Sequence, residues 1–166
     1  MHTLEDLESG ALAGARHVRL THLGLSHFPR QLLDLADTLE ILDLSGNQLT
    51  ALPNELAHFP QLRILFASCN PFTELPRVLG QCPQLEMVGF KACQIQHVPA
   101  DSLPPRLRWL ILTDNQISQL PDSLGQRPRL QKLMLSCNQL HALPDLSGCT
   151  RLELLRIASN CFTTLP

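Results

Sequence analysis

Histidine and cysteine are numerous enough in this sequence to suggest metal or covalent chemistry, with seven histidines and six cysteines. His17, His22 and His27 follow one another at intervals of five residues, and imidazole is a common metal ligand. The cysteines lack the close pairing of zinc and redox motifs. They are Cys69, Cys82, Cys93, Cys137, Cys149 and Cys161. Whether any of these side chains converge depends on the fold.

The sequence lacks the motifs that mark common enzyme classes. It contains no Gly-x-Ser-x-Gly, no glycine-rich phosphate loop, no His-Glu-x-x-His and no Cys-x-x-Cys. We therefore expect no catalytic, cofactor-binding or metal-binding residues and no cofactor in this segment. It is predicted not to be an enzyme, although a catalytic domain could follow in a longer chain.

Charge and hydropathy narrow the range of partners. The 13 basic and 15 acidic residues are scattered, so no basic stripe is present to neutralise nucleic-acid phosphates or an anionic membrane surface. The N-terminus has neither the basic start nor the apolar run of a secretory signal, and no apolar stretch approaches the ~18 residues of a membrane span. Together with the unpaired cysteines, these features predict a cytoplasmic protein that binds neither nucleic acid nor membrane.

A unit of 22 to 23 residues repeats along the chain. The segment "LRWLILTDNQISQLP" at 107–121 shows its pattern of spaced leucines, one asparagine and a final proline. One unit cannot bury its own leucines, so the units must stack on one another. The pattern predicts an N-terminal cap at 1–14 and an array of about seven units over 15–166, at 15–38, 39–61, 62–84, 85–106, 107–129, 130–151 and 152–166.

An asparagine recurs where five of the expected strands end, and its amide can satisfy backbone groups of the bend. We expect a structural ladder rather than a site, built from Asn47, Asn70, Asn115, Asn138 and Asn160. Cys93 and Leu23 occupy the equivalent place in two other units.

The two ends of the array differ. Thr3 and Asp6 have capping-box spacing, and the short helix that they predict would cover the first unit with Leu4, Leu7, Ala11 and Leu12. The last unit has no equivalent cover for Leu152, Leu155, Ile157 and Phe162. Because an array needs a polar terminal unit, the array is expected to be truncated at its C-terminal end.

These residues match the pattern L-x-x-L-x-L-x-x-N/C-x-L-x-x-L-P, and the chain resembles the leucine-rich-repeat superfamily. The resemblance implies an α/β solenoid: an open, curved, right-handed coil with a parallel β-sheet on the concave face and short helical or irregular returns on the convex side. In that register His17, His22 and His27 diverge, which argues against a metal site. Cys69 and Cys137 lie three units apart, roughly 14 Å at a strand spacing of ~4.8 Å, too far for a disulfide.

On the concave face, two rows of strand positions point away from the core and are not needed to fill it. They hold eight adjacent apolar side chains, with charged residues at the ends. This pattern predicts a surface that binds a protein. Trp109 and Ile111 lie at its middle and are expected to have no structural role, while Gly89 is expected to leave a gap that a partner side chain can enter. The predicted partner-binding residues are Arg19, Ile41, Asp43, Ile64, Phe66, Met87, Trp109, Ile111, Lys132, Met134, Leu154 and Arg156. The alternative is a scaffold whose apolar side chains shield one another.

The favoured function is a non-catalytic protein–protein interaction module. The 23-residue unit resembles the intracellular, Ras-group type of repeat. The segments "LEMVGFKA" (85–92), "LPPRLRWLILTDNQI" (103–117) and "LQKLML" (130–135) resemble the N-terminal region of bacterial proteins in which such repeats precede a protein-kinase-like domain. That resemblance implies, as an alternative, a substrate-recruiting or regulatory region whose partner is a C-terminal domain of the same polypeptide.

Two further alternatives remain at this stage. A bacterial effector is a third function, although the repeats of effectors run nearer 20 residues. A homodimer could form through the concave face or through the C-terminal end.

Overall fold

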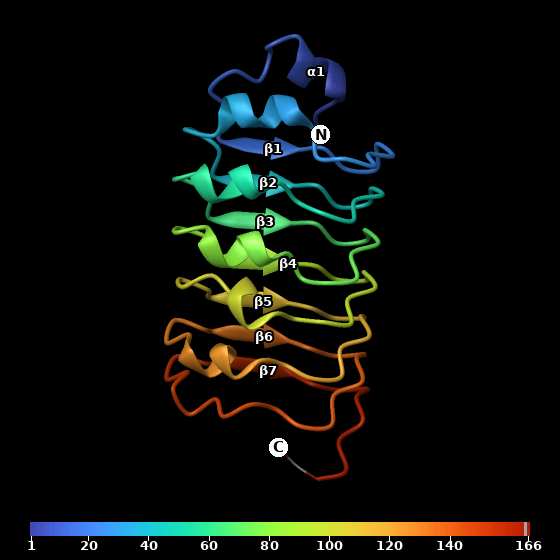
Figure 1. The fold of residues 1–166 in the computed structure, drawn as a ribbon, viewed down its shortest axis with the longest axis vertical. Coiled ribbons are helices and arrows are strands. Elements are labelled where there is room, and N and C mark those ends of the chain that lie inside the picture. Colours follow the sequence, from blue (N-terminus) through green and yellow to red (C-terminus); the bar gives the residue numbers. More distant parts are fainter. Residues whose placement is uncertain (165) are drawn as a thin grey trace.

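The computed structural model describes residues 1–164 and 166. Seven short parallel strands lie side by side in sequence order and form one open sheet, as Figure 1 shows. The strands are β1 (His17–Arg19), β2 (Ile41–Asp43), β3 (Ile64–Phe66), β4 (Met87–Gly89), β5 (Trp109–Ile111), β6 (Lys132–Met134) and β7 (Leu154–Arg156). The predicted α/β solenoid with a parallel sheet is therefore confirmed.

Between β1 and β6 the chain returns from one strand to the next through short 3₁₀ helices on the convex side (Figure 1). A proline precedes each helix, since its ring fixes φ at a value compatible with the turn and the missing N–H is not needed there. The helices are η1 (Arg30–Leu35), η2 (Asn54–His58), η3 (Arg77–Gln81), η4 (Ala100–Ser102) and η5 (Asp122–Gln126).

The core lies between the sheet and these returns. In the fifth unit Leu107, Leu110 and Leu112 are fully buried, and the equivalent leucines of the neighbouring units stack on them. Side-chain volume is balanced between units. Ala67 holds the inward position that Phe90 holds in the next unit, and the Phe90 ring packs edge-on against Phe72 with ring centroids 5.0 Å apart.

The asparagine ladder forms a hydrogen-bond relay between neighbouring units. The amide nitrogen of Asn138 donates to the carbonyl of Leu135 in its own unit and to that of Leu112 in the preceding unit. Its amide oxygen accepts from the N–H of Ile117. In most units, the carbonyl of the residue just after the strand therefore accepts two hydrogen bonds, one from each of two adjacent units. The expected structural role of the asparagines is confirmed.

Cys93 interrupts this relay. Its thiol donates to the carbonyls of Ala67 and Lys91, with sulfur–oxygen distances of 3.5 and 3.7 Å, and a thiol is a weaker donor than an amide. No donor from position 93 reaches the carbonyl of Phe90, which is left with one partner, the amide nitrogen of Asn115. Among the internal units, the one around β4 is therefore the least redundant part of the ladder.

A short helix, α1 (Leu4–Glu8), covers the first unit (Figure 1). The predicted capping box is present, because Thr3 and Asp6 each accept a hydrogen bond from the other's backbone N–H. Leu7 is buried, and Leu4 and Leu12 pack against the core. Ala11 was expected to cover the core as well but is exposed, because the chain has left the helix in a turn by that point.

The strand at the other end, β7, pairs on one side only, with β6. Leu155 in this strand is 37% exposed, and Leu152, Ile157 and Phe162 are half-buried. In the described part of the chain, no helix has both the length and the apolar character needed to cross a membrane.

Candidate binding surface

The concave face of the sheet is formed by two rows of side chains that point away from the core. Strand pairing places the first row in register as His17, Ile41, Ile64, Met87, Trp109, Lys132 and Leu154. The second row is Arg19, Asp43, Phe66, Gly89, Ile111, Met134 and Arg156. The two rows bring all twelve predicted residues together on one face.

The apolar side chains of these rows are half-buried rather than exposed. In the described residues, Met1 and Leu155 are the large apolar side chains that count as exposed, and both lie outside the concave rows. Neighbours in adjacent strands cover part of each other's surface, since opposed side chains on paired strands are in contact. These side chains therefore form an apolar surface without protruding members, which we call the apolar floor. It consists of Ile41, Ile64, Phe66, Met87, Trp109, Ile111, Met134 and Leu154.

Trp109 has two partners within the sheet. Its indole Nε1 donates to Oε1 of Gln131 at 3.3 Å, and Nζ of Lys132 lies 4.0 Å from the ring centroid. An ammonium at this distance is attracted to the ring face. Trp109 therefore has contacts within the array that the sequence alone did not predict. These contacts hold the indole in one orientation, with its ring part of the apolar floor.

Gly89 does not leave the gap expected from the sequence. A Cβ placed on Gly89 would lie 2.6 Å from Cδ1 of Phe66, so the Phe66 ring already occupies that space. Gly89 itself is buried. The missing side chain of one strand thus accommodates the large side chain of its neighbour, and a partner side chain cannot enter there while the ring stays in place.

A hollow of about 270 Å³ does open at the N-terminal end of the concave face. Val18, Ile41 and Phe66 give it an apolar lining, and Arg19 and Asp43 stand at its rim as an ion pair with a nitrogen–oxygen distance of 3.7 Å. Its remaining lining residues are His2 and His17. An apolar hollow with a few polar groups is the usual form of a site that receives one side chain.

His2 is a residue of this hollow that sequence reasoning missed. Its backbone N–H donates to the carbonyl of Arg19, and its ring Nδ1 accepts from the N–H of Arg19. The first residues thus extend along β1 and fix one wall of the hollow. No repeat pattern includes position 2, so periodicity gave no signal for it.

Metal-ion and thiol chemistry have little support among the described side chains. Within 1–164 and 166, no three metal-ligating side chains lie close enough together to hold a metal ion. Burial raises the pKa of the Cys82 thiol to about 12, and mainly burial raises that of Cys93 to about 11. Since the thiolate is the nucleophile, both side chains are poorly reactive at neutral pH.

Comparison with known families and structures supports the architecture. Two models described as leucine-rich repeat match the chain, one at residues 105–165 and the other at 38–59. No curated protein matches the chain.

Several solved structures share the fold. The plant peptide hormone receptor RGFR1, in complex with RGF2, has a TM-score of 0.78 and 27% identity over 93% of this chain and 26% of the receptor chain. The Toll–Spätzle complex of Drosophila has a TM-score of 0.75 and 27% identity over 87% of this chain and 20% of the matched chain. The TLR13–ssRNA13 complex has a TM-score of 0.77 and 31% identity over 87% of this chain and 21% of the matched chain. The chain therefore spans 26% or less of each of these neighbours.

Proposed function

From the leucine-rich-repeat fold of this chain, we propose that it is a non-catalytic interaction module that binds a protein partner on its concave face. One observation carries the proposal. Eight apolar side chains lie in two registered rows on six adjacent strands, with charged side chains at the ends of the rows. Half-buried apolar floors with polar rims are typical of protein interfaces.

The geometry supports an extended partner segment with an apolar anchor. The hollow at Ile41 and Phe66 receives one side chain, and the floor from Met87 to Met134 offers contact area beyond it. Tryptophan and methionine supply large contact areas, and methionine adapts its shape to its partner. The complexes of RGFR1 with RGF2 and of Toll with Spätzle agree with a peptide or protein as the class of ligand.

A protein is favoured over nucleic acid, although the TLR13 neighbour is seen with an RNA. The concave rows are mainly apolar, and their Arg19 is paired with Asp43. The formal net charge of −2 offers little attraction to a polyanion. We also propose that the protein is cytoplasmic.

The kinase-associated role remains a second proposal that rests on the resemblance of residues 85–92, 103–117 and 130–135. In it, the concave face recruits a substrate or contacts a C-terminal domain of the same polypeptide. Self-association through the concave face or through the C-terminal end stays a prediction. The effector role has no supporting observation beyond the repeats themselves.

A charge-insertion variant of the concave face tests the proposal. Trp109→Glu combined with Met134→Lys is expected to reduce capture of the protein partner by about tenfold or more, since both changes place charge in the apolar floor. The fold should persist, because the new carboxylate lies beside Lys132. Capture is measured by quantitative pull-down with the intact chain as bait, and circular dichroism checks the fold.

The matched control places the same charges on the convex side. Gln81→Glu with Gln126→Lys alters two exposed positions, one in η3 and one at the end of η5. Capture by this variant should equal that of the unaltered chain. If the folded concave variant also captures the partner unchanged, the concave face is not the binding surface.

A further inference from the structure

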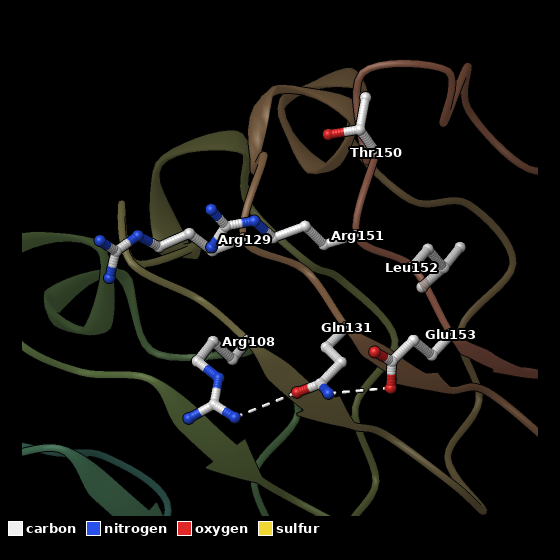
Figure 2. A pocket seen from close by; sticks show the side chains of 7 residues that line it. All are labelled: Arg108, Arg129, Gln131, Thr150, Arg151, Leu152 and Glu153. Atoms are coloured by element: carbon white, nitrogen blue, oxygen red, sulfur yellow. Dashed lines mark hydrogen bonds between the residues drawn. The ribbon is translucent and has the colours of Figure 1, made fainter.

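A second hollow, of about 490 Å³, lies at the edge of the sheet where strands β5 to β7 begin. Figure 2 shows the side chains that surround it. The Arg129 and Arg151 side chains extend in the same direction, above a row formed by Arg108, Gln131 and Glu153. Three guanidinium groups therefore share this hollow with one carboxylate.

Elsewhere along this edge the charges alternate and pair. Each residue that directly precedes a strand pairs with the equivalent residue of the next unit, in the order Arg16, Glu40, Arg63, Glu86 and Arg108. The nitrogen–oxygen distances along this series are 3.4, 3.6, 3.6 and 3.9 Å. Each internal member thus lies between two opposite charges.

The alternation stops at Gln131. A carboxylate would continue the pattern there, but the neutral amide accepts from Nη2 of Arg108 at 3.1 Å through its Oε1. Its Nε2 donates to Oε2 of Glu153 at 2.9 Å. Arg108 therefore has an anionic neighbour on one side only, at Glu86.

A parallel row adds positive charge at the same place. Three residues before each strand, the earlier units have Thr38, Gln61 and Gln84, and the later units have Arg106, Arg129 and Arg151. In the described residues neither Arg129 nor Arg151 takes part in an ion pair. The excess positive charge is thus concentrated where the sheet edge is hollowed.

We propose that this hollow, bounded by Arg108, Arg129 and Arg151, is an oxyanion-binding site that takes the carboxylate or phosphate group of a partner's side chain. Guanidinium groups bind both oxyanions through paired N–H donors and keep their charge at any physiological pH. Glu153 opposes such a ligand, and Gln131 holds its carboxylate at the far end of the row (Figure 2). The site is separate from the concave face, although Trp109 and the hollow share Gln131.

Arginine side-chain resonances report directly on this site. Titration with inorganic phosphate, a glutamate tripeptide and a phosphoserine tripeptide is expected to shift the Nε–Hε signals of Arg108, Arg129 and Arg151 in a saturable way. Arg30 and Arg77 are internal controls, because both are paired on the convex side with Glu55 and Asp101. Their signals should stay in place.

Two variants with opposite expected effects make the test sharper. Arg129→Gln with Arg151→Gln should weaken binding of the tightest probe by about tenfold, since two of three donors' charges are lost. Glu153→Gln should strengthen it roughly threefold, because a repelling charge is removed. The matched control, Arg30→Gln with Arg77→Gln, should leave the affinity unchanged.

The outcomes separate the sources of the oxyanion. Tighter binding of the phosphoserine peptide assigns the site to a phosphorylated partner, and tighter binding of the glutamate peptide assigns it to an acidic one. Equal, unsaturable shifts at all arginines would overturn the proposal, as would unchanged binding by the Arg129 and Arg151 variant. So would tighter binding of a short single-stranded RNA than of either peptide. These probes need no concave-face partner, so this test can fail while the proposed function stands.

Discussion

Replacing Asn115 by alanine is expected to lower the free energy of unfolding by about 3 kcal/mol, because two buried backbone groups lose their hydrogen-bond partner. The N–H of Ile95 donates to Oδ1 of Asn115 at 3.0 Å, and the carbonyl of Phe90 accepts from Nδ2 at 2.9 Å. Neither group has another partner in the described hydrogen bonds, because Cys93 does not reach Phe90. Urea denaturation followed by circular dichroism measures the change.

Asn138 is the matched comparison, since both asparagines are 7% exposed. Alanine at position 138 removes the acceptor of the Ile117 N–H, but the carbonyls of Leu112 and Leu135 keep donors from Asn115 and Asn160. The free energy of unfolding is expected to fall by about 1.5 kcal/mol, because only the Ile117 N–H is left without a partner. Equal losses in unfolding free energy for the two alanine variants would show that a second donor to the shared carbonyls does not contribute to stability.

Cys93→Asn supplies a converse check. An asparagine at position 93 can donate to the carbonyl of Phe90, as Asn138 does to that of Leu135. In this background the cost of Asn115→Ala should fall to about that of Asn138→Ala, near 1.5 kcal/mol. Additive effects of the two substitutions would contradict the relay.

Gly80→Ala is expected to destabilise the fold by about 3 kcal/mol, because the added methyl group overpacks a backbone contact. Gly80 lies in η3, and a Cβ there would overlap the backbone oxygen of Asp101 in η4. The clash cannot be relieved by a side-chain rotation. The two convex turns would have to separate. Thermal and urea unfolding measure the effect.

Gln81→Ala is the control for this substitution. Gln81 is the next residue in the same 3₁₀ helix and is exposed, so truncating it should change stability by less than about 0.5 kcal/mol. A Gly80→Ala variant as stable as this control would mean that the convex turns are not in fixed contact.

Much of the fold could be predicted because each unit repeats the same pattern. Leucine spacing placed all seven strands and the two rows of the concave face in register, since a parallel stack fixes which positions are neighbours. The asparagine ladder followed from the same periodicity. Its weak point at Phe90 did not, because that depends on how far a thiol can reach.

Side-chain conformation limited the prediction of the binding surface. That Phe66 fills the space above Gly89 is a matter of rotamer, and the contacts of Trp109 with Gln131 and Lys132 depend on how long side chains pack. The arginine hollow carried a readable signal, namely the alternation of charge at one repeat position. The hollow lies just outside the strands, so the two outward rows of the concave face do not include it.

Methyl NMR on the captured complex tests the central claim most directly. The chain has isoleucines on the concave face at positions 41, 64 and 111 and fully buried ones at 95 and 117. Methyl-labelled isoleucine and methionine should show the largest shifts on partner binding at Ile41, Ile64, Ile111, Met87 and Met134, with Ile95 and Ile117 nearly unchanged. Shifts confined to Met1 and Ile157, with the concave methyl groups unaffected, would contradict binding through this face.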